Sequence, residues 1–296
     1  MKPRHVLPAS FWFITRRCTQ RRFLLRPDDK LNQTFEYCLA AAAKRFRITI
    51  IAYMVESNHY HLAVYDHFGC LPAFLHYFNM LLARSVNCLR GHWENCFSPE
   101  APYQVRCLNR ADVLAKAVYT LTNPVKDDLV DAVASWPGAS SWRGMRTGRD
   151  RVVRRPAHFF TERMPKELPL ALCEVPSEAG DTVRAFLGES FFDEVAAAVA
   201  DTERQCAQAR RREGKSVLGR RCVRKQSPMG QPASVAPRRG LNPRIAARSK
   251  WQRIEALARD KAFLASHCEA RLRWQRGEAA CFPIGTWAMR HLIGPE

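Results

Sequence analysis

Two histidines separated by one residue are the clearest chemical feature of this sequence. His59 and His61 stand in the string HYHLAVY, which has the β-branched and aromatic residues of a strand. Residues i and i+2 of a strand project from one face about 7 Å apart, so both imidazoles face one way and Tyr60 faces the other. Imidazoles with a carboxamide or carboxylate suit a divalent ion that must also contact phosphate oxygens. The pair alone is a weak signal, because such histidines can equally be exposed strand residues or hydrogen-bonded core groups.

The residues around this pair predict an alternation of strands and helices. Strands are expected at residues 11–15, 47–55, 59–65 and 103–107. Helices are expected over 28–47, over 71–91 with Gly91 as C-cap, and from Asp112 as N-cap to Pro124. This order predicts an α+β fold, a ferredoxin-like split βαβ antiparallel sheet with helices on one face.

Three blocks of sequence extend the pattern over half of the chain. They are AYMVESNHYHLAVY (52–65), VYTLTNPVKDDLV (118–130) and WPGASSWRG (136–144). Together they resemble the REP-associated tyrosine transposases of the HUH single-strand transposase superfamily, whose usual motifs are close to AYVIMPNHVHLL, YIHLNPVRAGLV and WSS. The opening FITRRCTQRRFLL is similar to that family's first strand and turn. The resemblance covers about residues 10–143.

The resemblance implies a divalent metal, Mg or Mn, held by His59 and His61, with Tyr119 as nucleophile. Its attack would release a 3′-hydroxyl and leave the DNA 5′-phosphate on the phenol. A free phenol has a pKa of about 10, so a metal must stabilise charge on the phosphate and another group must take the proton. Asn123 matches the position of a third metal ligand in related enzymes, and on a helix it shares a face with Tyr119. A helix C-cap before Pro124 explains Asn123 equally well.

Other tyrosines compete for the nucleophile's role, since the chain has 7 of them. Tyr60 points away from the histidines, and Tyr53 and Tyr65 lie within strands. Tyr119 has small or polar companions on its helical face. The alternative for Tyr119 is a half-buried aromatic residue at the edge of the apolar stripe.

Two departures from the family's motifs stand out. Ser57 replaces a usual proline without touching the proposed ligands, whereas residues 92–107 replace a compact Trp-Gln-x-Arg-Phe stretch, so groups that position DNA are missing or moved. Glu56 and Glu94 are set aside as solvated turn residues.

The charge of the chain predicts a polyanionic partner. Its net charge is +19 and its pI is about 9.9, which favours nucleic acid over an acidic membrane surface. Arginine binds phosphate through its fixed fork of donors, although a solvated basic surface is the alternative. The predicted DNA-binding residues lie in the first turn and in later basic tracts: Arg16, Arg17, Arg21, Arg22, Arg211, Arg212 and Arg221.

Two domains are expected, a catalytic domain over residues 1–143 and a basic, mainly helical or irregular extension over 144–296. In the extension we expect a linker at 144–156, helices at 181–202 and 243–277, and a loop at 226–243. The 11 cysteines contain no CxxC unit and are interpreted as buried, reduced residues.

The leading hypothesis is a metal-dependent nickase and strand transferase for single-stranded or hairpin DNA. A domesticated DNA-binding protein that has lost cleavage is the alternative. A metal-dependent hydrolase of a small phosphorylated substrate explains the histidines but not the charge. No membrane segment is expected, a cytoplasmic protein follows, and the oligomeric state, monomer or homodimer, is left open.

Overall fold

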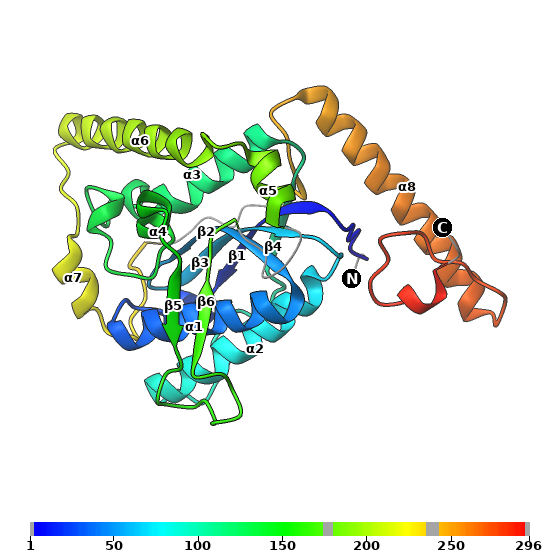
Figure 1. The fold of residues 1–296 in the computed structure, drawn as a ribbon, viewed down its shortest axis with the longest axis horizontal. Coiled ribbons are helices and arrows are strands. Elements are labelled where there is room, and N and C mark those ends of the chain that lie inside the picture. The colour runs from blue at the N-terminus through cyan, green and yellow to red at the C-terminus, as the bar shows by residue number, and fades with distance from the viewer. Residues whose placement is uncertain (1–2, 174–179, 235–242, 294–296) are drawn as a thin grey trace.

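The computed structural model describes residues 3–173, 180–234 and 243–293. Its first 126 residues alternate strands and helices in the predicted order (Figure 1). The elements are β1 (Ser10–Arg17), α1 (Asp29–Phe46), β2 (Ile48–Val55), β3 (His59–Asp66), α2 (Leu71–Arg90), β4 (Tyr103–Cys107) and α3 (Arg110–Lys126).

The main sheet has the strand order β2-β3-β1-β4-β7, and β1 is antiparallel to both β3 and β4. The order of the first four strands is that of a ferredoxin-like split βαβ fold. The fifth strand, β7 (Ile245–Ala246), comes from the C-terminal half and runs parallel to β4. The expected α+β class is confirmed.

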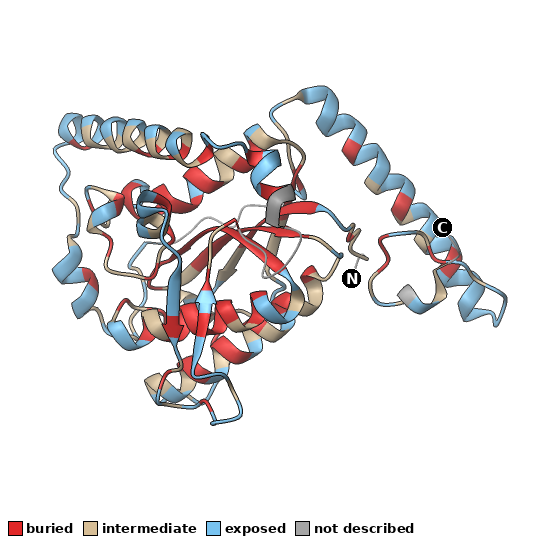
Figure 2. Ribbon diagram, viewed as in Figure 1, coloured by how far each residue is buried: buried red, intermediate tan, exposed pale blue. Residues whose placement is uncertain are grey.

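Helices cover both faces of this sheet, so the expectation of helices on one face is wrong. Side chains of β1 alternate between two cores: Trp12 and Ile14 pack with α1 and α2, whereas Phe11 and Phe13 pack with α3. Figure 2 shows buried residues concentrated in the strands and on the helix faces that meet them. The period of two along each strand therefore supplies an apolar side chain to each face.

The ends of the helices agree with the prediction at Gly91 and differ from it at both ends of α3. Gly91 ends α2 with a left-handed φ of 61°, and Asp28 caps α1. The N-cap of α3 is Asn109 instead of Asp112, whose carboxylate accepts a bond from the Arg248 N–H. Pro124 does not end α3, which continues to Lys126.

The tryptophan-containing block after α3 covers the free edge of the sheet. Residues 139–141 pair with β2, its outermost strand: Val55 N–H donates to Ala139 O at 3.0 Å, and Ser141 N–H donates to Tyr53 O at 3.0 Å. The Trp136 indole N–H also donates to Val55 O at 2.9 Å. An edge strand exposes unpaired backbone groups, and this block satisfies them where β2 leads into the histidine strand.

The C-terminal half packs on the first half. It contains α4 (Trp142–Thr147), β5 (Arg151–Arg154), β6 (Glu167–Leu170), α5 (Gly180–Leu187), α6 (Phe191–Glu213), α7 (Arg220–Lys225) and α8 (Lys250–Gln275). The boundary expected between residues 143 and 144 falls within α4, and Met145 and Val199 are buried in the α3-side core.

Local expectations for this half were partly wrong. The stretch 144–156 forms parts of α4 and β5 instead of a linker, and the single helix expected over 181–202 is divided at Gly188 into α5 and α6. Residues 226–234 carry no helix or strand, as expected, and residues 235–242 lie outside the described residues. The last predicted helix corresponds to α8, which extends away from the sheet in Figure 1.

The expectation that the cysteines are buried is wrong for six of the 11. All 11 have free thiols, and the ones that are exposed or half-buried are Cys70, Cys88, Cys206, Cys222, Cys268 and Cys281. Among the described residues, no helix combines the length and the apolar composition that a bilayer span requires.

Candidate active site

The two histidines lie at the start of β3, where this strand faces the end of β1. His59 is opposite Arg17 and His61 is opposite Thr15 in the antiparallel ladder. The two Nε2 atoms are 3.1 Å apart and the rings are perpendicular, with centroids 4.8 Å apart. The strand period thus directs both imidazoles to the α3 side of the sheet.

The other ring nitrogens are held by neighbouring side chains. His59 Nδ1 is 2.7 Å from Asn58 Oδ1, and an amide oxygen only accepts, so this nitrogen carries the proton. His61 Nδ1 is 2.8 Å from Thr15 Oγ1. When His61 donates to Thr15, the lone pairs of both Nε2 atoms face each other. Partners of this kind are what fix the ring of a metal-binding histidine.

Both imidazoles are in their neutral form near pH 7. Burial, with the charges of Arg17 and Arg21, lowers the pKa of His59 to about 3. Burial, together with His59, Arg17 and Lys116, lowers the pKa of His61 well below its usual range. Neutral imidazole is the form that binds a metal ion.

Helix α3 brings the two other predicted site residues to the pair. The Asn123 amide is in contact with His61, with Nδ2 2.5 Å from Nε2. Tyr119, one turn earlier, is 40% exposed and lies edge-on to His61 with ring centroids 5.5 Å apart. Asn123 is not the C-cap of α3, which is Asp127. A spacing of four residues puts both side chains on one face of the helix.

The donor set fits a divalent ion. Two ligand nitrogens on adjacent coordination positions at about 2.1 Å from an ion are about 3 Å apart, as these two are. A half-turn of the Asn123 amide exchanges its oxygen and nitrogen and directs an acceptor oxygen toward His61. Among the described residues, no three His, Cys, Asp or Glu side chains are grouped to hold a metal, and the amide in contact with the histidine pair is that of Asn123.

Glu56, which the sequence analysis set aside as solvated, is buried. Burial and the charge of Asp127 raise its pKa well above the usual range. Its Oε2 is 3.7 Å from His59 Nε2, and its buried Oε1 has no hydrogen-bond partner among the residues that the structure describes. Because His59 is neutral near pH 7, this contact is no ion pair.

Two lysines of α3 were missed by the sequence analysis. The Nζ atoms of Lys116 and Lys126 lie 5.5 Å and 5.3 Å from the centre of the Tyr119 ring. Lys116 is three residues before Tyr119, so helical spacing could have identified it. Lys126 lies two turns after Tyr119. It was missed because the helix was expected to end at Pro124.

The four predicted DNA-binding arginines of the first turn do not all lie on the histidine side of β1. Arg17 is exposed opposite His59, and the charges of Arg17 and Arg21 both act on that histidine. Arg16 points to the other face of β1, where its guanidinium donates to the Ser98 carbonyl at 2.8 Å. Arg22 follows the 3-10 turn Thr19–Arg21.

The three arginines predicted from the second half are all exposed. Arg211 and Arg212 lie in the last turn of α6, and Arg221 lies on α7. The preceding Arg210 is buried and anchors α6 to the end of α3, donating to Val125 O at 3.2 Å.

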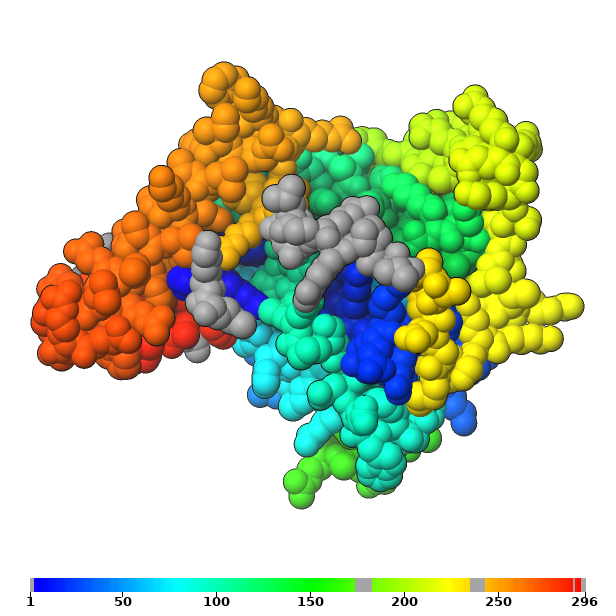
Figure 3. All heavy atoms as spheres, turned by 180° about the vertical axis from the view of Figure 1, so that it is seen from behind, coloured from blue at the N-terminus to red at the C-terminus, as the bar shows by residue number. Residues whose placement is uncertain are grey.

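The segment 218–230, which includes α7, borders the site. It runs from the end of α3, past the turn between β2 and β3, to the turn after β1, and Figure 3 shows it against the N-terminal residues. The contacts in this order are Leu218 N–H to Asp128 O, Ser57 Oγ to Gln226 Oε1, and Phe23 N–H to Gly230 O. Sequence spacing alone gives no sign of this path.

The comparison with solved structures finds matches, whereas no family profile and no curated protein matches the chain. One of the matching structures is a structure of the REP-associated tyrosine transposase bound to a REP hairpin. It has a TM-score of 0.42 and 18% sequence identity, and it covers 55% of this chain and 92% of that one.

Proposed function

We propose that this chain is a metal-dependent enzyme that nicks single-stranded or hairpin DNA and transfers the strand through Tyr119. The observation that carries the proposal is the meeting of two elements at one point. Strand β3 contributes His59 and His61 with facing Nε2 atoms, and α3 contributes Asn123 and Tyr119 on one face. A phenol beside a site for a cation is what phosphodiester attack requires.

In the proposed reaction the Tyr119 Oη forms a bond to phosphorus while the bond from phosphorus to the 3′-oxygen breaks. The phenol loses its proton and the departing 3′-oxygen gains one, so a 3′-hydroxyl and a 5′-phosphotyrosine result. Rejoining reverses these steps with a 3′-hydroxyl as the attacking group. The covalent link conserves the phosphodiester, so neither step needs an oxidant, a reductant or a nucleotide.

His59, His61 and Asn123 would hold Mg or Mn. A divalent ion there supplies positive charge against the non-bridging oxygens of the phosphate. Thr15 and Asn58 orient the imidazoles from their Nδ1 sides.

Positive side chains around the tyrosine suit the same substrate. Lys116 and Lys126 lie beside the Tyr119 ring, and Arg17 and Arg21 lie beside His59. Fixed positive charge at the reacting phosphate stabilises the charge that develops on it.

The test is an adduct assay with an end-labelled single-stranded hairpin oligonucleotide and Mn. We expect a labelled protein band that Tyr119→Phe abolishes. Tyr103→Phe is the matched control, because Tyr103 is a neighbouring tyrosine on β4 whose hydroxyl bonds only to the Pro243 carbonyl among the described residues. An adduct that persists in Tyr119→Phe contradicts the proposal. Hairpin binding without an adduct in any form, unaffected by His59→Ala, favours the alternative of a DNA-binding protein without cleavage.

A further inference from the structure

The loop after α2 contributes no residue to the candidate active site, and it carries a tryptophan that is almost fully exposed. Trp93 follows α2 and is 96% exposed. The loop around it is fixed by hydrogen bonds: Asn87 Nδ2 donates to Glu94 O at 2.8 Å, and Thr19 N–H donates to Cys96 O at 3.0 Å. An indole held in water by an ordered loop leaves a large apolar surface available for a ligand.

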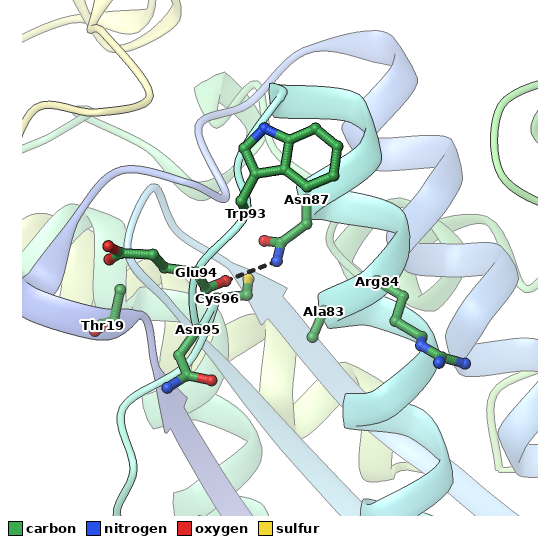
Figure 4. A pocket seen from close by; sticks show the side chains of 8 residues that line it. All are labelled: Thr19, Ala83, Arg84, Asn87, Trp93, Glu94, Asn95 and Cys96. Carbon is green, nitrogen blue, oxygen red and sulfur yellow. Dashed lines mark hydrogen bonds between the residues drawn. The ribbon is translucent and has the colours of Figure 1, made fainter.

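A pocket of about 480 Å³ lies beside this indole (Figure 4). Its other polar lining side chains are two amides, Asn87 and Asn95, with Thr19, Arg84 and Glu94. In Figure 4 the indole stands next to Asn87 at the end of α2.

A second hollow of about 520 Å³ adjoins this pocket. The two share Ala83, Asn95 and Cys96 and lie along α2, and together they are here called the Trp93 groove. The second part is lined by Arg4 and Arg16, and none of the described residues that line it is acidic.

The groove therefore holds three arginines against one glutamate. Burial and the charge of Arg244 lower the pKa of Arg4, one of these three arginines. A positive groove with an exposed aromatic ring is the combination that binds single-stranded nucleic acid, because bases stack on the ring while phosphates follow the charge. In a duplex both faces of each internal base are covered, so an unpaired base is the ligand that fits.

The groove is joined to the candidate active site through the end of β1. Thr19 lines the pocket, the adjacent Cys18 N–H donates to Asn58 O at 2.8 Å, and Arg17 lies opposite His59. Arg16 and Arg17 point to opposite faces of β1, one into the groove and one toward the histidines. A strand that leaves the groove over this edge meets Arg17 before it reaches Tyr119.

We propose that the Trp93 groove binds unpaired nucleobases of the DNA strand whose phosphate is placed at Tyr119, with one base stacked on Trp93. This inference rests on the proposed function and adds a binding site for the substrate away from the reacting phosphate.

The test measures binding of the full chain to a single-stranded oligonucleotide that carries 2-aminopurine, in EDTA so that cleavage does not occur. Stacking on Trp93 is expected to quench the probe. Trp93→Ala should remove the quenching and weaken binding about 5- to 100-fold, the effect of losing one stacked base. Trp93→Phe should keep affinity within about threefold, because the ring is retained.

Trp251 on α8 supplies the matched control, since it is also exposed, at 76%. Trp251→Ala should leave quenching and affinity unchanged. Binding that Trp93→Ala does not weaken overturns the groove as a base-binding site and leaves the Tyr119 proposal standing. Absence of any binding by the unsubstituted chain instead overturns the proposed function, so the two failures are distinguishable.

Discussion

The phenol of Tyr119 lies edge-on to the imidazole of His61, with ring centroids 5.5 Å apart and an angle of 79° between the ring planes. The two residues come from α3 and β3, which meet only through tertiary packing. Phe13 of β1 packs edge-on against Tyr119 at 5.6 Å and stacks with His61 at 5.3 Å. This apolar ring therefore contacts both the proposed nucleophile and one of the proposed metal ligands.

Thr15 is predicted to strengthen metal binding without contacting the metal. Thr15→Val keeps the β-branched shape but removes the oxygen 2.8 Å from His61 Nδ1. We expect Mn affinity to fall about 10- to 100-fold in a calorimetric titration, as for other partners of ligand histidines. Thr49→Val is the matched control, because Thr49 makes a similar 2.9 Å bond to His67, which is not a proposed ligand. Equal affinity in the two variants would show that Thr15 does not orient the ligand.

Lys116 is predicted to accelerate formation of the adduct. Lys116→Met keeps a long side chain but removes the charge 5.5 Å from the Tyr119 ring. The single-turnover rate at saturating DNA should fall about tenfold or more, because a fixed positive charge near the developing phosphate charge is lost. Lys44→Met changes an exposed lysine of α1 on the opposite side of the sheet and should have no effect. A normal rate in Lys116→Met contradicts this role.

Asp28 is predicted to give the fold an acid-sensitive contribution. Burial by itself raises its pKa, but the Leu31 N–H and the Arg90 guanidinium, 2.6 Å away, lower it by more, so the net pKa lies below its usual range. Its contribution is then complete above about pH 5 and is lost as the pH falls through the folded pKa, below about 4.

Asp28→Asn keeps the capping oxygen and removes the charge. We expect a loss of about 1–2 kcal/mol in the free energy of unfolding at pH 7, measured by urea denaturation, and a smaller difference from the unsubstituted protein at pH 3. Asp29→Asn is the control, because the neighbouring Asp29 is 91% exposed on its side chain and should contribute little. A difference for Asp28→Asn that is the same at both pH values contradicts the account.

The sequence predicts the elements that carry the site because each depends on local periodicity. The period of two along β3 puts His59 and His61 on one face, and the spacing of four along α3 does the same for Tyr119 and Asn123. The order of strands and helices follows from the same patterns, and the end of α2 at Gly91 follows from local backbone chemistry.

Contacts made across the sheet could not be predicted in this way. Thr15 supports His61 only because β1 and β3 pair in one particular register, and Glu56 is buried only because other segments cover the turn that follows β2. The path of residues 218–230 around the site is likewise set by single hydrogen bonds between distant residues. None of these relations leaves a periodic signal in the chain.

The most direct test of the account is to identify the residue that becomes attached to DNA. The adduct formed with Mn and a single-stranded hairpin oligonucleotide would be digested with nuclease and protease, and the modified peptide sequenced by mass spectrometry. The account predicts a nucleotide on the phenol oxygen of Tyr119, within the peptide of α3. A nucleotide on any other residue, Tyr103 included, would contradict it.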